Sequence, residues 1–237
     1  MIARFIPLLA LSAAMPVAMP VMAADRTVSV GSFERVRVDG PFEVRIIAGG
    51  SPGAKLAGDR DLIERIAVQV NGGTLTVRLG TGGWGERFAT RNATPPIITL
   101  STPRLTNLAV SAGARTSVNQ MTGQQVAVSV HGSGSLVVER VDADQFTAAL
   151  LGAGTLIVGG QANRARLTSD GAATIDAAKL AVKDLVVQLN GLGETIAMAR
   201  QTAQVTTTGL GKVTVTGPAT CTVRAIAGGP VICGSRK

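Results

Sequence analysis

The segment VAVSVHGSGSLVV, residues 126–138, contains the pattern from which the fold can be predicted. Its apolar residues alternate with small or polar ones on both sides of a corner at Gly132. Alternation with a period of two is typical of β-strands that have one buried face. Glycine suits the corner because a left-handed backbone conformation costs it nothing. The segment therefore predicts two short strands joined by a tight turn, with Val128, Val130, Leu136 and Val138 facing inward.

The same pattern returns along residues 107–237. Corner glycines stand 19, 20, 19, 20, 18 and 19 residues apart, at Gly113, Gly132, Gly152, Gly171, Gly191, Gly209 and Gly228. A period of this length is typical of a solenoid, in which each coil buries its inward face against its neighbours. We predict an all-β fold, a parallel β-helix with coils of about 19–20 residues. One coil is out of step, because its apolar residues after Gly191, Ile196 and Met198, come one position late. This predicts a β-bulge.

Residues 28–112 carry a less regular version of the pattern. The segment 36–46 overlays 128–138 residue for residue, so solenoid packing is expected to start near Val28. Residues 59–66 have apolar side chains at helical spacing behind acidic residues, which predicts one capped helical turn. Residues 68–79 predict a hairpin around Asn71-Gly72-Gly73, and residues 80–96 are expected to form a loop.

Residues 1–23 predict an export signal, with Arg4 before an apolar run and a small-residue cleavage site at Val21-Met22-Ala23. The mature chain, residues 24–237, is expected to be a single domain without a transmembrane segment. Loss of Arg4 takes the formal net charge from +8 to +7. The basic residues are dispersed and have no interleaved aromatic residues, so nucleic acid is not an expected partner. We expect a Gram-negative protein of the periplasm, the cell surface or the medium.

Four motifs carry a resemblance to a known family. They are Gly40-Pro41-Phe42-Glu43-Val44, Gly58-Asp59 with Leu62-Ile63 and Ile66, Asn71-Gly72-Gly73-Thr74-Leu75, and Leu105-Thr106-Asn107-Leu108 running into the glycine corners. The chain resembles the putative auto-transporter adhesin head GIN domain family over most of its mature length. The resemblance implies an exported, right-handed parallel β-helix without an established enzymatic role, with a provisional adhesion or surface-binding function. It implies no site residues.

The loop at 80–96 is the preferred candidate ligand site. It gathers the only tryptophan of the chain with an aromatic ring and two guanidinium groups, in Trp84, Arg87, Phe88 and Arg91. Such a set can stack on a sugar face and hold an acidic group. The alternative is that Trp84 and Phe88 cover an open end or side of the solenoid.

Other candidates have simpler explanations. His131 is the only histidine, and its repeat column contains Leu151, Asp170, Asn190 and Thr208, so an outward turn position is expected. Two pairs of carboxylates, Asp142 with Asp144 and Asp59 with Asp61, could bind calcium or face a substrate, but each is isolated. Calcium requires six to eight oxygen ligands, so solvated turn residues are the better interpretation. We expect no metal, no cofactor and no catalytic residues.

Two further features concern the last coils and the outer face. Cys221 and Cys233 are the only cysteines, and either a disulfide closes the final coil or both thiols are buried and free. Ser129, Thr168, Gln188 and Thr206 form a polar outward row. Such a row could bind an extended polymer, but it is also ordinary for a solvated sheet.

The sequence favours a non-enzymatic exported β-helix protein that binds an envelope glycan or a surface protein. Two alternatives stay open. One is a polysaccharide-active enzyme, which requires converging carboxylates. The other is a structural or accessory envelope module that assembles through its stacking edges. The oligomeric state is not predicted.

Overall fold

The computed structural model describes residues 24–80 and 95–234. The expected export signal and the candidate residues Trp84, Arg87, Phe88 and Arg91 lie outside the described residues. The described part contains one helix, α1 (Arg60–Glu64), and one 16-stranded sheet. The strands are β1 (Ala24–Val28), β2 (Arg35–Asp39), β3 (Glu43–Ala48), β4 (Gly53–Gly58), β5 (Ile66–Asn71), β6 (Thr74–Leu79), β7 (Ile97–Thr102), β8 (Asn107–Ser111), β9 (Arg115–Gly132), β10 (Ser135–Gly152), β11 (Thr155–Gly171), β12 (Thr174–Gly191), β13 (Glu194–Thr207), β14 (Lys212–Thr216), β15 (Thr220–Ala225) and β16 (Val231–Cys233).

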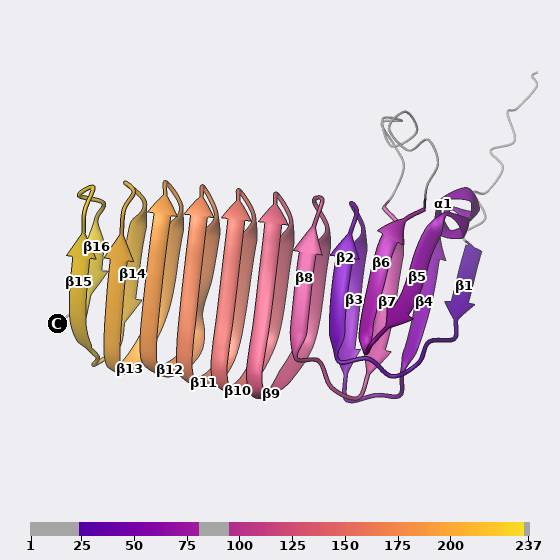
Figure 1. Cartoon of the computed structure of the whole chain (residues 1–237), viewed down its shortest axis with the longest axis horizontal. Helices are drawn as coiled ribbons and strands as arrows, with labels where there is room; N and C mark the ends of the chain where they lie inside the picture. The colour runs from indigo at the N-terminus through magenta and orange to yellow at the C-terminus, as the bar shows by residue number, and fades with distance from the viewer. Residues whose placement is uncertain (1–23, 81–94, 235–237) are drawn as a thin grey trace, which may run out of the picture.

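The sheet is wound into parallel coils that stack along the long axis of the molecule (Figure 1). Like positions form ladders through the interior. Leu136 pairs with Thr116 on one side and Leu156 on the other, and the ladder continues through Ile175, Thr195 and Val213. All of these side chains are buried. The predicted parallel β-solenoid is therefore confirmed, with Val128, Val130, Leu136 and Val138 facing inward as expected.

The strands of the regular coils are longer than the sequence predicts. Two short strands are expected per coil, but β10 runs unbroken for 18 residues from Ser135 to Gly152. Its pairing with β9 continues through the second bend, where Arg140 lies opposite Gln120 and Val141 opposite Met121. That bend is wide enough to keep the ladder hydrogen-bonded, so the strand does not end there. The glycine corners lie at the upper edge in Figure 1, and these back bends lie at the lower edge.

The corners need glycine for two reasons. Gly171 has φ +100°, in the left-handed region. A Cβ atom on Gly171 would also lie 2.6 Å from the carbonyl oxygen of Gly152 in the preceding coil. A Cβ atom on Gly191 would lie closer still to the carbonyl oxygen of Gly171. Stacked corners therefore exclude side chains as well as demanding an unusual backbone.

The β-bulge predicted after Gly191 is wrong. Pairing of β12 with β13 is continuous from Glu194 to Ala197, and Thr195 and Ala197 are the buried residues while Ile196 faces outward. The irregularity lies at the back bend, where the register shifts between Ala177 and Ala181 and again before Asp184. The wide bend can shorten the coil without disturbing the corner, whereas a shift beside Gly191 would break the corner stack. The result is a threonine in the core.

The first coils confirm the overlay of residues 36–46 on 128–138. Val36 lies opposite Leu108, and Leu108 lies opposite Val128. After the corner, Val44 lies opposite Thr116, which in turn pairs with Leu136. The positions aligned in the sequence therefore occupy the same ladders.

The order of the coils in space differs from their order in the chain. The coil of β6 and β7 stacks outside that of β2 and β3, and β8 then returns to the other side of β2. The returning connection runs past the start of β2, where the Thr106 amide donates to the Glu34 carbonyl oxygen at 2.8 Å and Arg104 pairs with the Glu34 carboxylate at 2.6 Å. The coil of residues 35–48 is therefore an interior layer of the stack.

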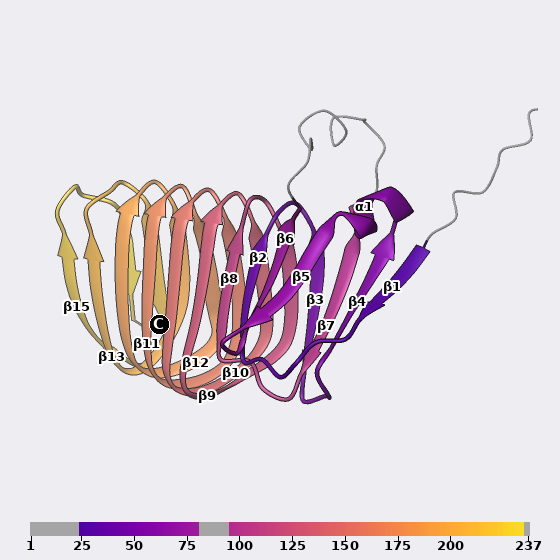
Figure 2. The same cartoon turned by 45° about the vertical axis from the view of Figure 1, so that its right-hand side comes forward.

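Antiparallel strands cover the end of the stack that lies beyond β6 and β7 (Figure 2). β4 pairs antiparallel with β7, β1 with β4, and β5 with β6. The expectation that solenoid packing starts near Val28 is therefore wrong, because Val28 lies in the antiparallel strand β1 and parallel coiling begins with β2 at Arg35. Terminal layers that differ from the repeat are usual for solenoids, whose end faces need a cover.

The two local predictions for this region are confirmed. The hairpin of β5 and β6 turns at Gly72 and Gly73, which have φ +54° and +73°, as a two-residue turn with two left-handed residues requires. Helix α1 begins after Asp59, whose carboxylate accepts hydrogen bonds from the amides of Asp61 and Leu62. Asp59 is thus a helix cap.

Candidate functional site

A polar groove of about 530 Å³ runs along the back bends of β9 to β13. Thr122, Asp142 and Gln161 follow one another on adjacent strands along one side of it. Two residues further along the same strands, Gln124, Asp144 and Asn163 line the groove as well. The bend lies opposite the glycine corners, along the lower edge in Figure 1.

The sequence forms this groove because inward-facing residues separate the two polar rows. Gly123, Ala143 and Ala162 lie opposite one another in register, and both alanines are buried. In a strand, residues on either side of an inward residue point outward. At an outward bend these two positions diverge, which leaves a hollow above the small residues.

Hydrogen bonds from coil to coil hold both polar rows. Gln161 Nε2 donates to Asp142 Oδ1 at 3.1 Å, and Asn163 Nδ2 donates to Asp144 Oδ1 at 2.8 Å. Each carboxylate retains a second oxygen with acceptor capacity, and each amide retains its carbonyl oxygen. The rows therefore present both acceptors and donors in fixed positions.

Two cations lie toward the C-terminal side of the groove. Lys183 comes from β12 and Arg200 from β13, and both are exposed. Together with Asp142 and Asp144, they give the lining residues as many positive as negative charges. The groove thus offers hydrogen-bonding groups without an excess of either charge.

The structure corrects the expected location of the Asp142 and Asp144 pair. Both residues lie within β10 and not in a turn, because the strand continues through the bend. Asp59 and Asp61 lie far from them in the stack, at the start of α1. Within residues 24–80 and 95–234, no group of three or more His, Cys, Asp or Glu side chains is placed to hold a metal ion.

His131 lies where the repeat alignment puts it. It is exposed next to the corner at Gly132 and stands opposite Leu151, and the ladder continues through Asp170 and Asn190. Thr208 donates to the Asn190 side chain at 2.7 Å in the same column. His131 is therefore remote from the groove, on the opposite edge of the coil.

The expected polar outward row exists but is interrupted. Ser129, Thr168, Gln188 and Thr206 share one ladder, in which Ala149 stands between Ser129 and Thr168. Strand positions of this kind form a flat surface. They offer fewer converging groups than the back bend does.

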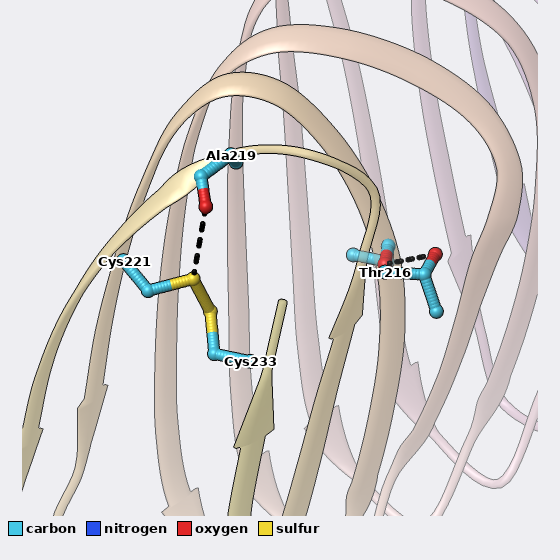
Figure 3. Close-up of a disulfide and its surroundings, with 5 residues drawn as sticks. Thr216, Ala219, Cys221 and Cys233 are labelled. Carbon is cyan, nitrogen blue, oxygen red and sulfur yellow. Dashed lines mark hydrogen bonds between the residues drawn. A yellow bond between two sulfur atoms is a disulfide. The ribbon is translucent and has the colours of Figure 1, made fainter. Parts of the chain in front are cut away.

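In the structure, a disulfide joins Cys221 of β15 and Cys233 of β16, with their Cα atoms 6.3 Å apart (Figure 3). Cys221 continues the inner ladder from Ala203, and Cys233 continues that from Val215. The link therefore crosses the interior of the last described coil. Among the described residues, no helix is long and apolar enough to cross a membrane.

Sequence reasoning found the two aspartates but missed their partners. Gln161 and Asn163 follow Asp142 and Asp144 by 19 residues, and Thr122 and Gln124 precede them by 20. A pair of polar residues spaced by two and repeated at the coil period was the available signal. It is weak, because outward polar residues recur at many strand positions.

Comparison with known proteins gives the family. A family model described as putative auto-transporter adhesin, head GIN domain, matches residues 32–219, most of the chain. The chain belongs to this GIN domain family. The match ends before Thr220, so it includes the whole groove and leaves out β15 and β16.

Solved structures share the fold of this GIN domain. A putative adhesin from Bacteroides fragilis has a TM-score of 0.81 at 17% identity, covering 90% of this chain and 97% of that one. A putative adhesin from Parabacteroides distasonis has a TM-score of 0.73 at 19% identity, with 92% and 98% covered. A protein from the same species, described as a putative lipid binding protein, has a TM-score of 0.70 at 16% identity, with 91% and 97% covered. No curated protein matches the chain.

Proposed function

We propose that this GIN domain protein is an exported, non-enzymatic binding module that holds an envelope glycan or a surface protein in the groove of β9 to β13. The observation that carries the proposal is the groove itself, where side chains from five successive strands line one continuous hollow. Ligand sites are usually concave surfaces with a few convergent polar groups. The names of the solved relatives, putative adhesins, agree with this role.

Export to the periplasm, the cell surface or the medium is part of the proposal. It is supported by the signal-like residues 1–23 and by the disulfide, since disulfides persist in oxidising compartments. Fusion of residues 1–23 to a reporter that is active only outside the cytoplasm tests it. Activity that depends on Arg4 and the apolar run supports export, and an inactive reporter contradicts it.

A pull-down with an immobilised cell-envelope fraction tests the binding role. The purified protein is compared with the double variant Asp142→Asn, Asp144→Asn, which keeps the size of both side chains and removes both charges. Asp170→Asn is the matched control, since it removes an exposed carboxylate at the corner edge. We expect retention to fall by about tenfold in the double variant alone, the effect of losing charged hydrogen bonds. Equal retention of all three proteins would contradict the proposal.

Residues 80–96, for which the sequence predicts a loop, are proposed as a second contact region. Its residues Trp84 and Arg87 have the chemistry to hold a glycan. Trp84→Ala in the same pull-down separates the two regions. Loss of retention in Trp84→Ala and none in the double variant would assign binding to the loop instead of the groove.

A polysaccharide-active enzyme is the second candidate, because two carboxylates lie at the groove. Glycoside hydrolysis needs an acid and a base or nucleophile facing one another across the scissile bond. Incubation of the protein with envelope polysaccharide, followed by measurement of new reducing ends, tests this candidate. If the protein releases reducing ends and the double variant does not, the protein is an enzyme and the proposed non-enzymatic function is wrong.

A further inference from the structure

The hydrogen-bonding groups, charge and length of the groove favour one class of ligand. The choice of that class rests on the proposed binding function. The polar groups of the groove come in carboxylate–amide pairs, Asp142 with Gln161 and Asp144 with Asn163. A hydroxyl group both donates and accepts a hydrogen bond. Each pair offers an acceptor beside a group that can donate and accept, so adjacent hydroxyls of one ligand can be satisfied at one pair.

The charge of the lining residues disfavours a charged polymer. Two aspartates and two cations balance one another, so neither a polyanion nor a polycation meets a complementary surface. A lipid chain fits poorly too. The described residues that line the groove have polar or small side chains, such as Ala162 and Ala181. None of them has a large apolar side chain.

The length and direction of the groove indicate an extended ligand. Its lining residues come from β9, β10, β11, β12 and β13, which are adjacent in the stack. Neighbouring strands lie about 4.8 Å apart, so five strands span about 19 Å along the long axis. A hollow of this length accommodates several linked units, and each of the five strands contributes at least one polar side chain to its lining.

From these observations we infer that the groove binds a neutral, unbranched, hydroxyl-rich glycan whose chain lies along the solenoid axis. Asp142 and Asp144 accept hydrogen bonds from ligand hydroxyls through the carboxylate oxygens that do not bond to Gln161 and Asn163. Gln161 and Asn163 supply paired donors and acceptors. Ala143 and Ala162 face inward between the two polar rows, so no outward side chain keeps the ligand from the backbone at these positions.

The first test uses the envelope fraction of the pull-down after selective chemistry. Periodate cleaves carbon–carbon bonds that carry adjacent hydroxyls, proteinase K removes proteins, and solvent extraction removes lipids. We expect periodate to abolish retention and the other two treatments to leave it unchanged. Loss of retention after proteinase K would identify a protein ligand and overturn the inference while the proposed function stands.

The second test measures direct binding by calorimetry, with cellohexaose, maltohexaose and xylohexaose as neutral probes and hexagalacturonate as an acidic one. We expect the purified protein to bind at least one neutral hexamer about tenfold more tightly than it binds the corresponding disaccharide. The Asp142→Asn, Asp144→Asn variant should bind that hexamer about tenfold more weakly than the unaltered protein does. Asp170→Asn should bind like the unaltered protein. Affinity should change little between 50 mM and 500 mM salt, concentrations chosen to screen charge pairs strongly.

The outcomes separate the inference from the function on which it rests. Preference for hexagalacturonate, strong weakening by salt, or absence of binding to every neutral hexamer overturns the inference. If retention by the envelope fraction still depends on Asp142 and Asp144 in that case, the proposed function survives. If retention never depends on them, both are wrong.

Discussion

At the scale of single residues, the corner glycines carry the stacking of the coils. A Cβ on Gly191 would collide with the backbone of Gly171, whereas a Cβ on Gly132 would meet nothing within 4 Å. Both residues have positive φ, at +142° and +83°. The two positions therefore separate the cost of backbone strain from the cost of a steric clash between coils.

We predict that Gly132→Ala lowers the free energy of unfolding by about 1–2 kcal/mol, the cost of a left-handed alanine. Gly191→Ala should cost about 4 kcal/mol or more, because overpacking against backbone is added to that strain. Urea unfolding followed by circular dichroism measures both. Equal losses in the two variants would show that the corners are not in steric contact.

Thr195 is a second residue with a measurable consequence. Its side chain is buried between Ile175 and Val213 of the neighbouring strands, and its hydroxyl has no hydrogen-bond partner within the residues that the structure describes. Thr207 is also buried, but its hydroxyl donates to the Gly209 carbonyl oxygen at 3.2 Å.

We predict that Thr195→Val raises the free energy of unfolding by about 1–2 kcal/mol, since it removes an unsatisfied buried polar group at nearly constant volume. Thr207→Val is the matched control and should be neutral or destabilising, because it deletes a formed hydrogen bond. Chemical unfolding of both variants provides the comparison. A destabilised Thr195→Val would mean that the hydroxyl is satisfied in solution.

At the scale of elements, the last strands depend on a covalent link. β15 pairs with β13 and β16 with β14, each along one edge. Val223 occupies an inner ladder but is 45% exposed, because the described stack ends at this coil. Packing alone therefore holds these strands less firmly than the central ones.

We predict that removing the disulfide, by Cys221→Ser with Cys233→Ser, costs about 3 kcal/mol in the stability of the last coil, as for a closed loop of similar length. Amide exchange should accelerate in β15 and β16 and stay unchanged in β10 and β11. Treatment of the unaltered protein with dithiothreitol should have the same effect, and the double variant should not respond to it. Uniform acceleration along the chain would contradict a local role.

At the scale of the whole molecule, the coils are stacked out of chain order. β2 and β3 lie early in the sequence but are paired on both edges, with β6 and β8 and with β7 and β9. The antiparallel strands β1, β4 and β5 form the cover beyond them. In a solenoid, stability is set largely by contacts between neighbouring layers.

We predict that amides of β2 and β3 exchange as slowly as those of β10, and that β1 and β15 exchange fastest. Layers with neighbours on both sides open only with the whole stack, while edge strands open alone. Hydrogen exchange with mass spectrometry resolves these segments. Rapid exchange of residues 35–48 would indicate that this coil lies at an end of the stack, as sequential coiling requires.

Several features could be predicted from the amino-acid pattern alone: the coil period, the corner glycines, the inner ladders, the hairpin at Gly72 and Gly73 and the cap at Asp59. These features depend on periodicity and on local backbone chemistry, which a single strand or turn already contains. The coil after Gly191 was misread because Ile196 and Met198 look inward by hydrophobicity alone. Corner stacking overrode that preference and placed Thr195 in the core.

Three features follow from three-dimensional packing and not from the sequence pattern: the order of the first coils, the unbroken strands through the back bend and the groove. The insertion of β6 and β7 outside β2 depends on pairing between segments whose patterns are equivalent in the sequence. The groove depends on register, because Asp142 meets Gln161 and Asp144 meets Asn163 only when coils stack at this offset. The coil period shows that side chains 19 residues apart come near one another after winding, but it does not show that these four side chains bond in pairs beside a shared hollow.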